Sequence, residues 1–251
     1  VRMRYYTVKE VSLTDALLHA QEYVDLAGEM PTQAAAMLRL LLAVLFTVFS
    51  RVDAKGKPQP LAQSDDALER WSELWQLGHF PAEPVRDYLE QWKDRFWLFH
   101  PTHPFWQVPT LSNGIEFDGK KLNGERAESG NKTPLFQNIS KAECAVLTYA
   151  QAARWLIYQN GYDERGGRPK AGNKPRHGVG WLGQIGFVAV KGKNLYETLL
   201  RNMAFSTEQD ALQEKQMPCW EREHARTEQS VEIVMPKNQA ELLTLQSRRI
   251  L

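Results

Sequence analysis

The sequence predicts an α+β fold in which helices predominate and short β-strands come late in the chain. In the first part, apolar side chains recur every three or four positions, which is typical of helices with one buried face. Later runs of Ile, Val and Phe, bounded by glycine and polar residues, indicate short strands. With 251 residues, 43% of them hydrophobic, the chain can bury a sizeable core. We therefore expect one large domain over residues 1–251.

The first two predicted helices differ in how much of their surface is apolar. One begins at Ser12, is amphipathic, and runs to Gly28. The other covers residues 31–50 and is apolar on nearly all sides, which predicts a central core helix. The apolar run within it, residues 34–49, is interrupted by Arg39 and is shorter than a membrane span requires. No membrane association is therefore expected.

Two further helices are predicted before residue 100. Ser64 is a good N-cap residue, and Gly78 is a good residue to end the helix that follows. Pro84 opens the next helix. It carries a stripe that we expect to face the core: Val85, Tyr88, Leu89, Trp92 and Phe96.

The middle of the chain alternates loops with one helix. Prolines in residues 100–109 predict a fixed, non-helical loop, and residues 110–134 hold the turn signals of hairpins or a mobile loop. Ser140 and Glu143 have the spacing of a capping box, in which each satisfies a free amide at the helix start. We expect the helix that they open to continue to about Gln159.

The last third of the chain holds the predicted strands. Residues 178–193 mix small residues with β-branched ones and indicate a short strand. Asn194 can cap a helix that continues through Phe205. Residues 231–234 and 244–251 are the two remaining predicted strands.

The charge of the chain is balanced overall but uneven along its length. A net charge of +1 argues against a protein that coats nucleic acid non-specifically. Residues 165–193, however, hold seven cations, eight of the 16 glycines and no acidic residue. Such a segment can approach a nucleic-acid groove closely, and it can equally be a solvated flexible loop.

Few residues are arranged for catalysis or metal binding. His100 and His103 could serve a metal-dependent nuclease, but no carboxylate lies nearby in sequence and the adjoining prolines equally indicate a structural turn. Cys144 and Cys219 each stand alone, which argues against a zinc site and fits a reducing, cytoplasmic setting. No glycine pattern matches a P-loop or dinucleotide fold, so no cofactor is expected.

Several stretches in a fixed order resemble one known family. They are Pro31-Thr32-Gln33 with residues 38–42, His103-Pro104-Phe105-Trp106-Gln107, residues 152–156, residues 180–186, residues 194–202, Pro218-Cys219-Trp220-Glu221 and residues 245–250. In order and spacing they resemble CasA, the large-subunit family of the type I-E CRISPR surveillance complex Cascade. The resemblance extends from Pro31 to Leu251.

This resemblance implies a non-catalytic subunit of an RNA-guided antiviral complex. Its members have a mixed α and β N-terminal domain followed by a four-helix bundle, which is absent here. The implied partners are other Cascade subunits, the CRISPR guide RNA, target double-stranded DNA and the helicase-nuclease. Guide pairing reads the target, and the large subunit checks a short adjacent motif in the duplex. The alternative is a subunit that has only a structural role in assembly of the complex and contacts no target DNA. Val1 and Leu251 suggest truncation at both ends.

Two recognition segments follow from the resemblance. The guide-RNA contact matches Phe136, Gln137 and Asn138, where Phe136 can stack on a base or fill the core of its own domain. The DNA-facing glycine loop matches Gly166 and Gly167, next to the minor groove. Its phosphate neighbours are Arg165, Arg168 and Lys170.

The sequence departs from the family pattern at one metal site. Some members bind zinc through paired cysteines near the start of the helix that here holds Thr148 and Gln151, so no zinc is expected. The DNA-reading lysine and the glutamine-bearing wedge of the family would fall beyond Leu251.

Overall fold

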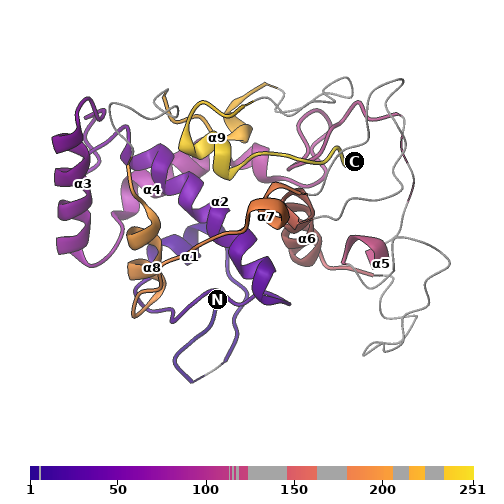
Figure 1. Ribbon diagram of the computed structural model, residues 1–251, viewed down its shortest axis with the longest axis horizontal. Coiled ribbons are helices and arrows are strands. Elements are labelled where there is room, and N and C mark those ends of the chain that lie inside the picture. Colours follow the sequence, from indigo (N-terminus) through magenta and orange to yellow (C-terminus); the bar gives the residue numbers. More distant parts are fainter. Residues whose placement is uncertain are drawn as a thin grey trace. The chain divides into compact units, whose positions relative to one another are not determined.

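The computed structural model describes residues 1–5, 7–112, 114, 116, 119–123, 146–162, 180–205, 215–223 and 235–251 (Figure 1). These residues are mostly helical. The helices are α1 (Leu13–Leu18), α2 (Pro31–Phe49), α3 (Ser64–Leu77), α4 (Ala82–Gln91), α5 (Gly119–Leu122), α6 (Tyr149–Tyr162), α7 (Trp181–Ile185), α8 (Leu195–Asn202) and α9 (Gln239–Leu243), with the 3-10 turns η1 (Lys93–Phe96) and η3 (Cys219–Glu221).

The expected short strands are absent from the part of the chain that the structure describes. Its sheet-like pairings are isolated bridges, which join Arg2 to Val8 and Asp25, and Val52 to Pro58. The strand expected at residues 178–193 is wrong for its described part, because residues 181–185 form α7 and Gly186, at φ 77°, ends that helix. Residues 231–234 lie outside the described residues.

The chain divides into two compact units. Unit 1 comprises Val1–Lys93, Phe187–Glu223 and Met235–Leu245, and unit 2 comprises Asp94–Gly186, His224–Val234 and Gln246–Leu251. Both units are assembled from segments that are far apart in sequence. The expectation of one domain over residues 1–251 stays a prediction.

Helix α2 forms the core of unit 1, as its all-round apolar surface predicts. It packs against α4, α8 and α9 (Figure 1). Its side chains from Leu40 to Phe46 are all buried. Burying a leucine of this kind contributes about 1.5–3 kcal/mol. Among the described helices, α2 alone has the length and apolar composition of a membrane span, and 78% of that window is buried inside the fold.

Two helix starts in unit 1 follow the capping rules. Ser12 Oγ accepts the amide of Asp15 at 3.0 Å, and Asn194 Oδ1 accepts the amide of Glu197 at 2.8 Å, as predicted. Helix α1, however, ends at Leu18 rather than Gly28. The following backbone pairs with other segments instead, since Tyr23 O accepts the amide of Leu195 at 2.8 Å. Tertiary pairing therefore overrides the helical period.

Helices α3 and α4 partly follow their predicted bounds. Gly78 ends α3 at φ 71°, as expected, but the cap is a capping box of Gln63 and Asp66, and Ser64 is already helical. Helix α4 buries Val85, Tyr88 and Leu89. It ends at Gln91, where the chain tightens into η1, so Trp92 and Phe96 do not extend its apolar stripe.

The chain after α9 is irregular rather than a strand. Thr244 caps α9, and in unit 2 the amide of Arg248 donates to a side chain, Asn160 Oδ1, at 3.0 Å. One backbone bond, from the amide of Val108 to Ile250 O at 2.7 Å, joins this segment to the predicted fixed loop. Side-chain partners thus take the place of a strand ladder.

Candidate nucleic-acid interface

The residues predicted to contact nucleic acid lie outside the described residues. They are Phe136, Gln137 and Asn138 in residues 124–145, and Arg165, Gly166, Gly167, Arg168 and Lys170 in residues 163–179. The described residues of unit 2 include the helices to which the ends of both segments are attached. These helices, which we call the scaffold, are α5, α6 and α7, and they pack against one another through α6.

A close backbone contact joins the two ends of residues 163–179. Gly180 precedes α7 and lies against the C-terminal turn of α6, where a Cβ on Gly180 would be 2.3 Å from Gly161 O and 2.7 Å from Tyr162 N. A side chain cannot occupy that space, so glycine is required there. The predicted DNA-facing segment therefore begins and ends at the same point of unit 2.

The predicted guide-RNA segment is attached to the same helix. Gln159 Nε2, near the end of α6, donates to Leu122 O at the end of α5 at 2.8 Å. The far end of residues 124–145 leads into Tyr149, the first residue of α6. These two attachment points are about 15 Å apart along the helix axis, from the 1.5 Å rise per residue. One helix thus anchors both segments.

The start of α6 differs from the prediction. Residues 146–148 are not helical, so no helix runs continuously from Ser140 to Gln159, and the Ser140–Glu143 pair lies outside the described residues. The capping box is made by Thr148 and Gln151. The Thr148 amide donates to Gln151 Oε1 at 2.9 Å, and the Gln151 amide donates to Thr148 Oγ1 at 3.2 Å. These two side chains thus cap the start of α6.

Asn160 is a buried polar residue that sequence reasoning missed. Its side chain is fully buried, its Nδ2 donates to Leu156 O at 3.0 Å, and its Oδ1 accepts the Arg248 amide. Its backbone oxygen also accepts the Ser247 hydroxyl. Asn160 therefore fixes residues 246–251 to the last turn of α6, immediately before the basic segment. A lone Asn in a helical pattern gave no signal of this role.

Exposed aromatic side chains cluster beside the start of α6. Phe99 is 61% exposed and Tyr149 72% exposed, and their rings meet edge to face with centroids 5.2 Å apart. Trp97 is also exposed and contacts the His100 ring edge to face. The sequence signalled only Trp97, which falls off the buried face of the preceding helical pattern, whereas Phe99 falls on that face, three residues after Phe96.

The histidine pair forms a turn. His100 Nδ1 accepts the His103 amide at 3.0 Å and lies 3.3 Å from the Thr102 amide, so this ring nitrogen caps the turn. The two rings lie 5.6 Å apart, centroid to centroid. Within the described ranges, no group of three His, Cys, Asp or Glu side chains is placed to hold a metal ion. The geometry supports the structural interpretation of this loop.

Trp106 in the same loop has an uncommon backbone conformation. It is buried and adopts a φ of 55°, in the left-handed region that non-glycine residues rarely occupy. Gln107 Nε2 fastens the loop by donating to Leu98 O at 2.8 Å. The fixed, non-helical loop predicted for residues 100–109 is confirmed.

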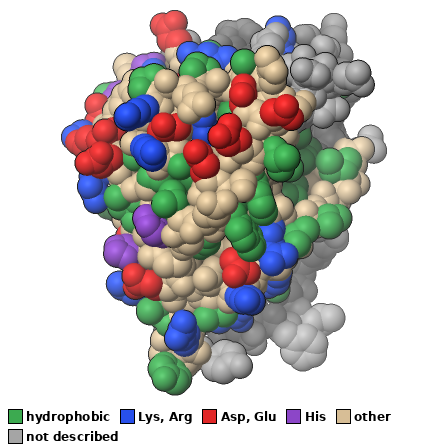
Figure 2. All heavy atoms as spheres, turned by 90° about the vertical axis from the view of Figure 1, so that its left-hand side faces the viewer, with side chains coloured by type: hydrophobic (Ala, Val, Ile, Leu, Met, Phe, Trp, Pro, Cys, Tyr) green, Lys and Arg blue, Asp and Glu red, His purple; other side chains and the backbone are tan. Residues whose placement is uncertain are grey.

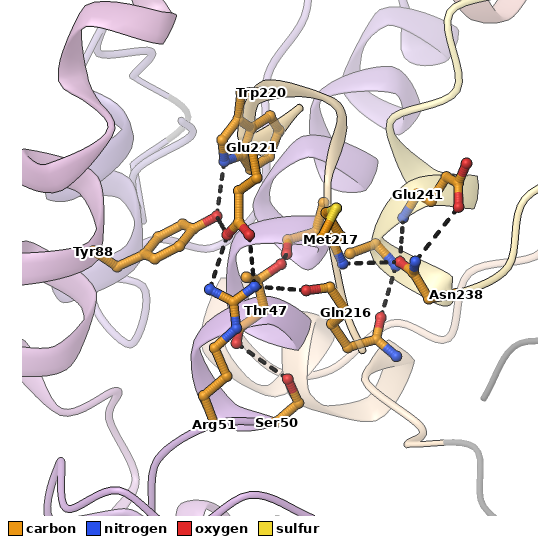
Figure 3. Close-up of polar contacts among 12 residues, drawn as sticks. Thr47, Ser50, Arg51, Tyr88, Gln216, Met217, Trp220, Glu221, Asn238 and Glu241 are labelled. Carbon is orange, nitrogen blue, oxygen red and sulfur yellow. Dashed lines mark hydrogen bonds and ion pairs between the residues drawn. The ribbon is translucent and has the colours of Figure 1, made fainter. Parts of the chain in front are cut away.

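A charged network in unit 1 holds residues 215–223 in place (Figure 3). The Arg51 guanidinium makes two bonds to the Glu221 carboxylate, at 2.9 and 2.7 Å, and a third to Gln216 O at 2.6 Å. The Tyr88 hydroxyl donates to Glu221 at 2.7 Å and accepts from Trp220 Nε1 at 2.8 Å. Paired bonds between a guanidinium and a carboxylate are among the strong hydrogen bonds of proteins.

This network has structural rather than catalytic chemistry. Burial first, and then the Glu221 carboxylate, raise the pKa of Tyr88, so the phenol stays neutral at physiological pH. The neighbouring Cys219 is buried, and its amide donates to Thr244 Oγ1 at 2.9 Å. Cys144 lies outside the described residues. The sequence stretch from Pro218 to Glu221 is thus anchored at three consecutive residues.

Known proteins resemble this chain along nearly its whole length. A family model described as CRISPR-associated protein Cse1 matches residues 1–251. The CRISPR-associated protein CasA/Cse1 of Thermus thermophilus is 36% identical over 220 residues, which are 85% of this chain and 39% of that relative. The crystal structure of Thermobifida fusca Cse1 has 32% sequence identity and a TM-score of 0.77, and the match covers 99% of this chain and 46% of that one.

A more distant match shows the same fold. One chain of a solved CRISPR RNA-guided surveillance complex has 22% sequence identity and a TM-score of 0.68, with 97% of this chain and 48% of that chain covered. This chain thus spans less than half the length of each of these relatives. Because the family model matches every residue of it, this chain belongs to the Cse1 (CasA) family of CRISPR-associated proteins.

Proposed function

We propose that this chain is the N-terminal part of the large subunit of a type I-E Cascade complex. In this role it cuts no nucleic acid itself, and it works in the cytoplasm with other Cascade subunits. Membership of the Cse1 family supports the proposal, as does the shared fold with a chain of a CRISPR RNA-guided surveillance complex. The observation that carries it is that α6 anchors the ends of both predicted recognition segments.

The first segment binds the end of the guide RNA. Phe136 stacks on an exposed base, a contact worth about 1–3 kcal/mol, and Asn138 hydrogen-bonds beside it. Gln137 lies between them in sequence. A segment attached at both ends to α6 loses less conformational entropy on binding than a free tail does. Its attachment therefore favours the contact with the guide RNA.

The second segment meets the target duplex beside the guide-paired region. Gly166 and Gly167 let the backbone approach the minor groove, while Arg165, Arg168 and Lys170 neutralise phosphates. Minor-groove contacts distinguish base pairs poorly, which suits a check that tolerates several motifs. The assembled complex then recruits the helicase-nuclease.

Incorporation into the complex tests the guide-RNA contact. Phe136→Ala should lower the fraction of this subunit that co-purifies with the other subunits and guide RNA. Val146→Ala removes an 80% exposed side chain at the other end of the same segment and should incorporate normally. Equal melting temperatures would show that both variants fold. Normal incorporation of Phe136→Ala would mean that Phe136 has no guide-RNA role.

A further inference from the structure

A second basic surface lies in unit 1, outside the α5, α6 and α7 scaffold. Residues 1–9 and 187–193 carry five cations and no acidic residue. Both segments flank residues 23–25. The Arg2 amide donates to Asp25 O at 2.8 Å on one side, and on the other side Lys191 Nζ lies 2.6 Å from Asp25 Oδ2. We call this set the basic surface: Arg2, Arg4, Lys9, Lys191 and Lys193.

The basic surface carries more cations than neighbouring carboxylates. The Asp25 carboxylate forms ion pairs with both Arg2, at 3.3 Å, and Lys191. Arg4, Lys9 and Lys193 are exposed, and no ion pair joins them to a carboxylate of the described chain. Two more carboxylates lie beside these cations. Glu197 pairs with Arg201 and accepts the Lys193 amide at 3.0 Å, and the exposed Glu10 directly follows Lys9. An anionic ligand would therefore meet an excess of cations here.

Apolar side chains are interspersed with these cations. Tyr5 is 91% exposed and Val188 92% exposed, and Val8 and Val190 are also open to solvent. In Figure 2 the lowest part of the face shown carries hydrophobic and basic side chains, and acidic side chains lie mostly in the upper half. Exposed aromatic rings among cations are typical of surfaces that bind single-stranded nucleic acid.

We propose that the basic surface binds single-stranded nucleic acid, with the cations on its phosphates and Tyr5 stacked on a base. A duplex keeps its bases paired and stacked, so an exposed phenol matches an unpaired base better. The inference rests on the proposed function, because an RNA-guided complex holds a guide RNA and also creates a displaced DNA strand. Such a surface would bind one of these two strands by their shared phosphate and base chemistry.

A charge-matched pair of triple variants of the full-length protein tests this surface. Arg4→Gln/Lys9→Gln/Lys193→Gln removes three of its cations. Lys55→Gln/Lys57→Gln/Arg86→Gln removes three exposed cations elsewhere on unit 1. Fluorescence anisotropy then follows binding of one mixed sequence as single-stranded DNA, as RNA and as duplex, between about 50 and 200 mM salt, where phosphate contacts dominate affinity.

The variant that lacks Arg4, Lys9 and Lys193, called the surface variant, should bind single strands about tenfold more weakly. The slope of log affinity against log salt concentration should become shallower by about 2, because each of the three lost phosphate contacts removes about 0.7. Tyr5→Ala should weaken binding about tenfold without changing that slope. The control variant should behave as wild type. Tighter binding of RNA than of DNA identifies the guide as the bound strand, and the reverse identifies the displaced strand.

Three results would overturn the inference: no wild-type binding at the lowest salt, equal losses in the two triple variants, or binding of the duplex as tightly as of single strands. Its failure is separable from failure of the proposed function. If Gly166→Asp weakens duplex binding by the assembled complex while the surface variant binds single strands normally, the inference is wrong and the proposed function stands.

Discussion

Gly180 and Gly161 approach so closely that a Cβ on Gly180 would lie 2.3 Å from the Gly161 carbonyl oxygen. The contact joins the start of α7 to the end of α6 and closes the predicted DNA-facing segment at its base. A rigid base restricts where the cations of that segment can reach, so this backbone contact links the fold to the proposed recognition of DNA.

Gly180→Ala should therefore destabilise unit 2. A methyl group against backbone atoms forces α7 to move, at a cost of about 1–3 kcal/mol. Gly183→Ala is the matched control, because a Cβ there meets its nearest atom, Tyr162 O, at an ordinary 3.6 Å. In the interior of α7 that change should be neutral or stabilise by up to about 1 kcal/mol. Urea denaturation of both variants measures the difference, and similar unfolding free energies would contradict the role of Gly180.

Asn160→Ala should loosen residues 246–251. The substitution leaves the buried Arg248 amide without its acceptor, which costs about 1–3 kcal/mol. Gln159→Ala loses one part-buried bond to Leu122 O and should cost less, about 0.5–1.5 kcal/mol. Hydrogen exchange of the Arg248 amide reports the change directly. Unaltered protection of that amide in Asn160→Ala would show that Asn160 does not hold the segment.

Local rules of helix formation predicted the elements that depend on neighbouring residues. Ser12 and Asn194 cap their helices, Gly78 ends α3, and the all-apolar run of residues 31–50 became the core helix. For the two caps and for Gly78 the deciding interaction lies within a few residues of the chain. For the core helix the all-round apolar sequence was itself the signal, and α4, α8 and α9 then bury it.

Elements that depend on distant contacts were predicted poorly. Helix α1 stops early because residues 20–23 pair with α8, and residues 246–251 stay irregular because Asn160 takes the Arg248 amide. The strand predicted at residues 178–193 was wrong because small residues such as those around Gly180 are also compatible with a helix that packs closely against backbone. The basic surface combines residues 1–9 with residues 187–193. Because these segments are far apart in the sequence, the sequence alone did not show that their cations lie together. The predicted contact residues themselves came from the family resemblance and remain predictions.

The stability of unit 1 should fall at alkaline pH. The pKa of Tyr88 is raised by burial and by Glu221, and burial also raises the pKa values of Tyr23 and Tyr196. Because the folded state favours the neutral phenols, their contribution is complete below the ordinary tyrosine pKa of about 10 and is lost as the pH rises above it.

Tyr88→Phe tests this pH dependence. At neutral pH it should lower the unfolding free energy by about 1.5–3 kcal/mol, because the hydroxyl bonds a charged acceptor. Above pH 10 the variant should lose stability less steeply than wild type, since one of the three shifted phenols is gone. Denaturation series at neutral and alkaline pH supply both values. Parallel losses in the two proteins would exclude Tyr88 as a source of the pH dependence.

The histidine loop should support no cleavage. His100 Nδ1 already accepts the His103 amide, so the pair is committed to a turn. Purified protein incubated with labelled duplex and Mg²⁺ or Mn²⁺ should leave the DNA intact. Metal-dependent cleavage that disappears in His103→Ala would instead establish a nuclease and refute the non-catalytic assignment.

Duplex binding by the assembled complex tests the proposed recognition role most directly. Gly166→Asp and Gly167→Asp each add a side chain and a negative charge where the backbone is proposed to enter the groove. Each should weaken binding of a target duplex about tenfold or more, with subunit composition unchanged. Unchanged duplex binding by correctly assembled complexes carrying these substitutions would contradict the proposed role and leave a subunit that serves assembly alone.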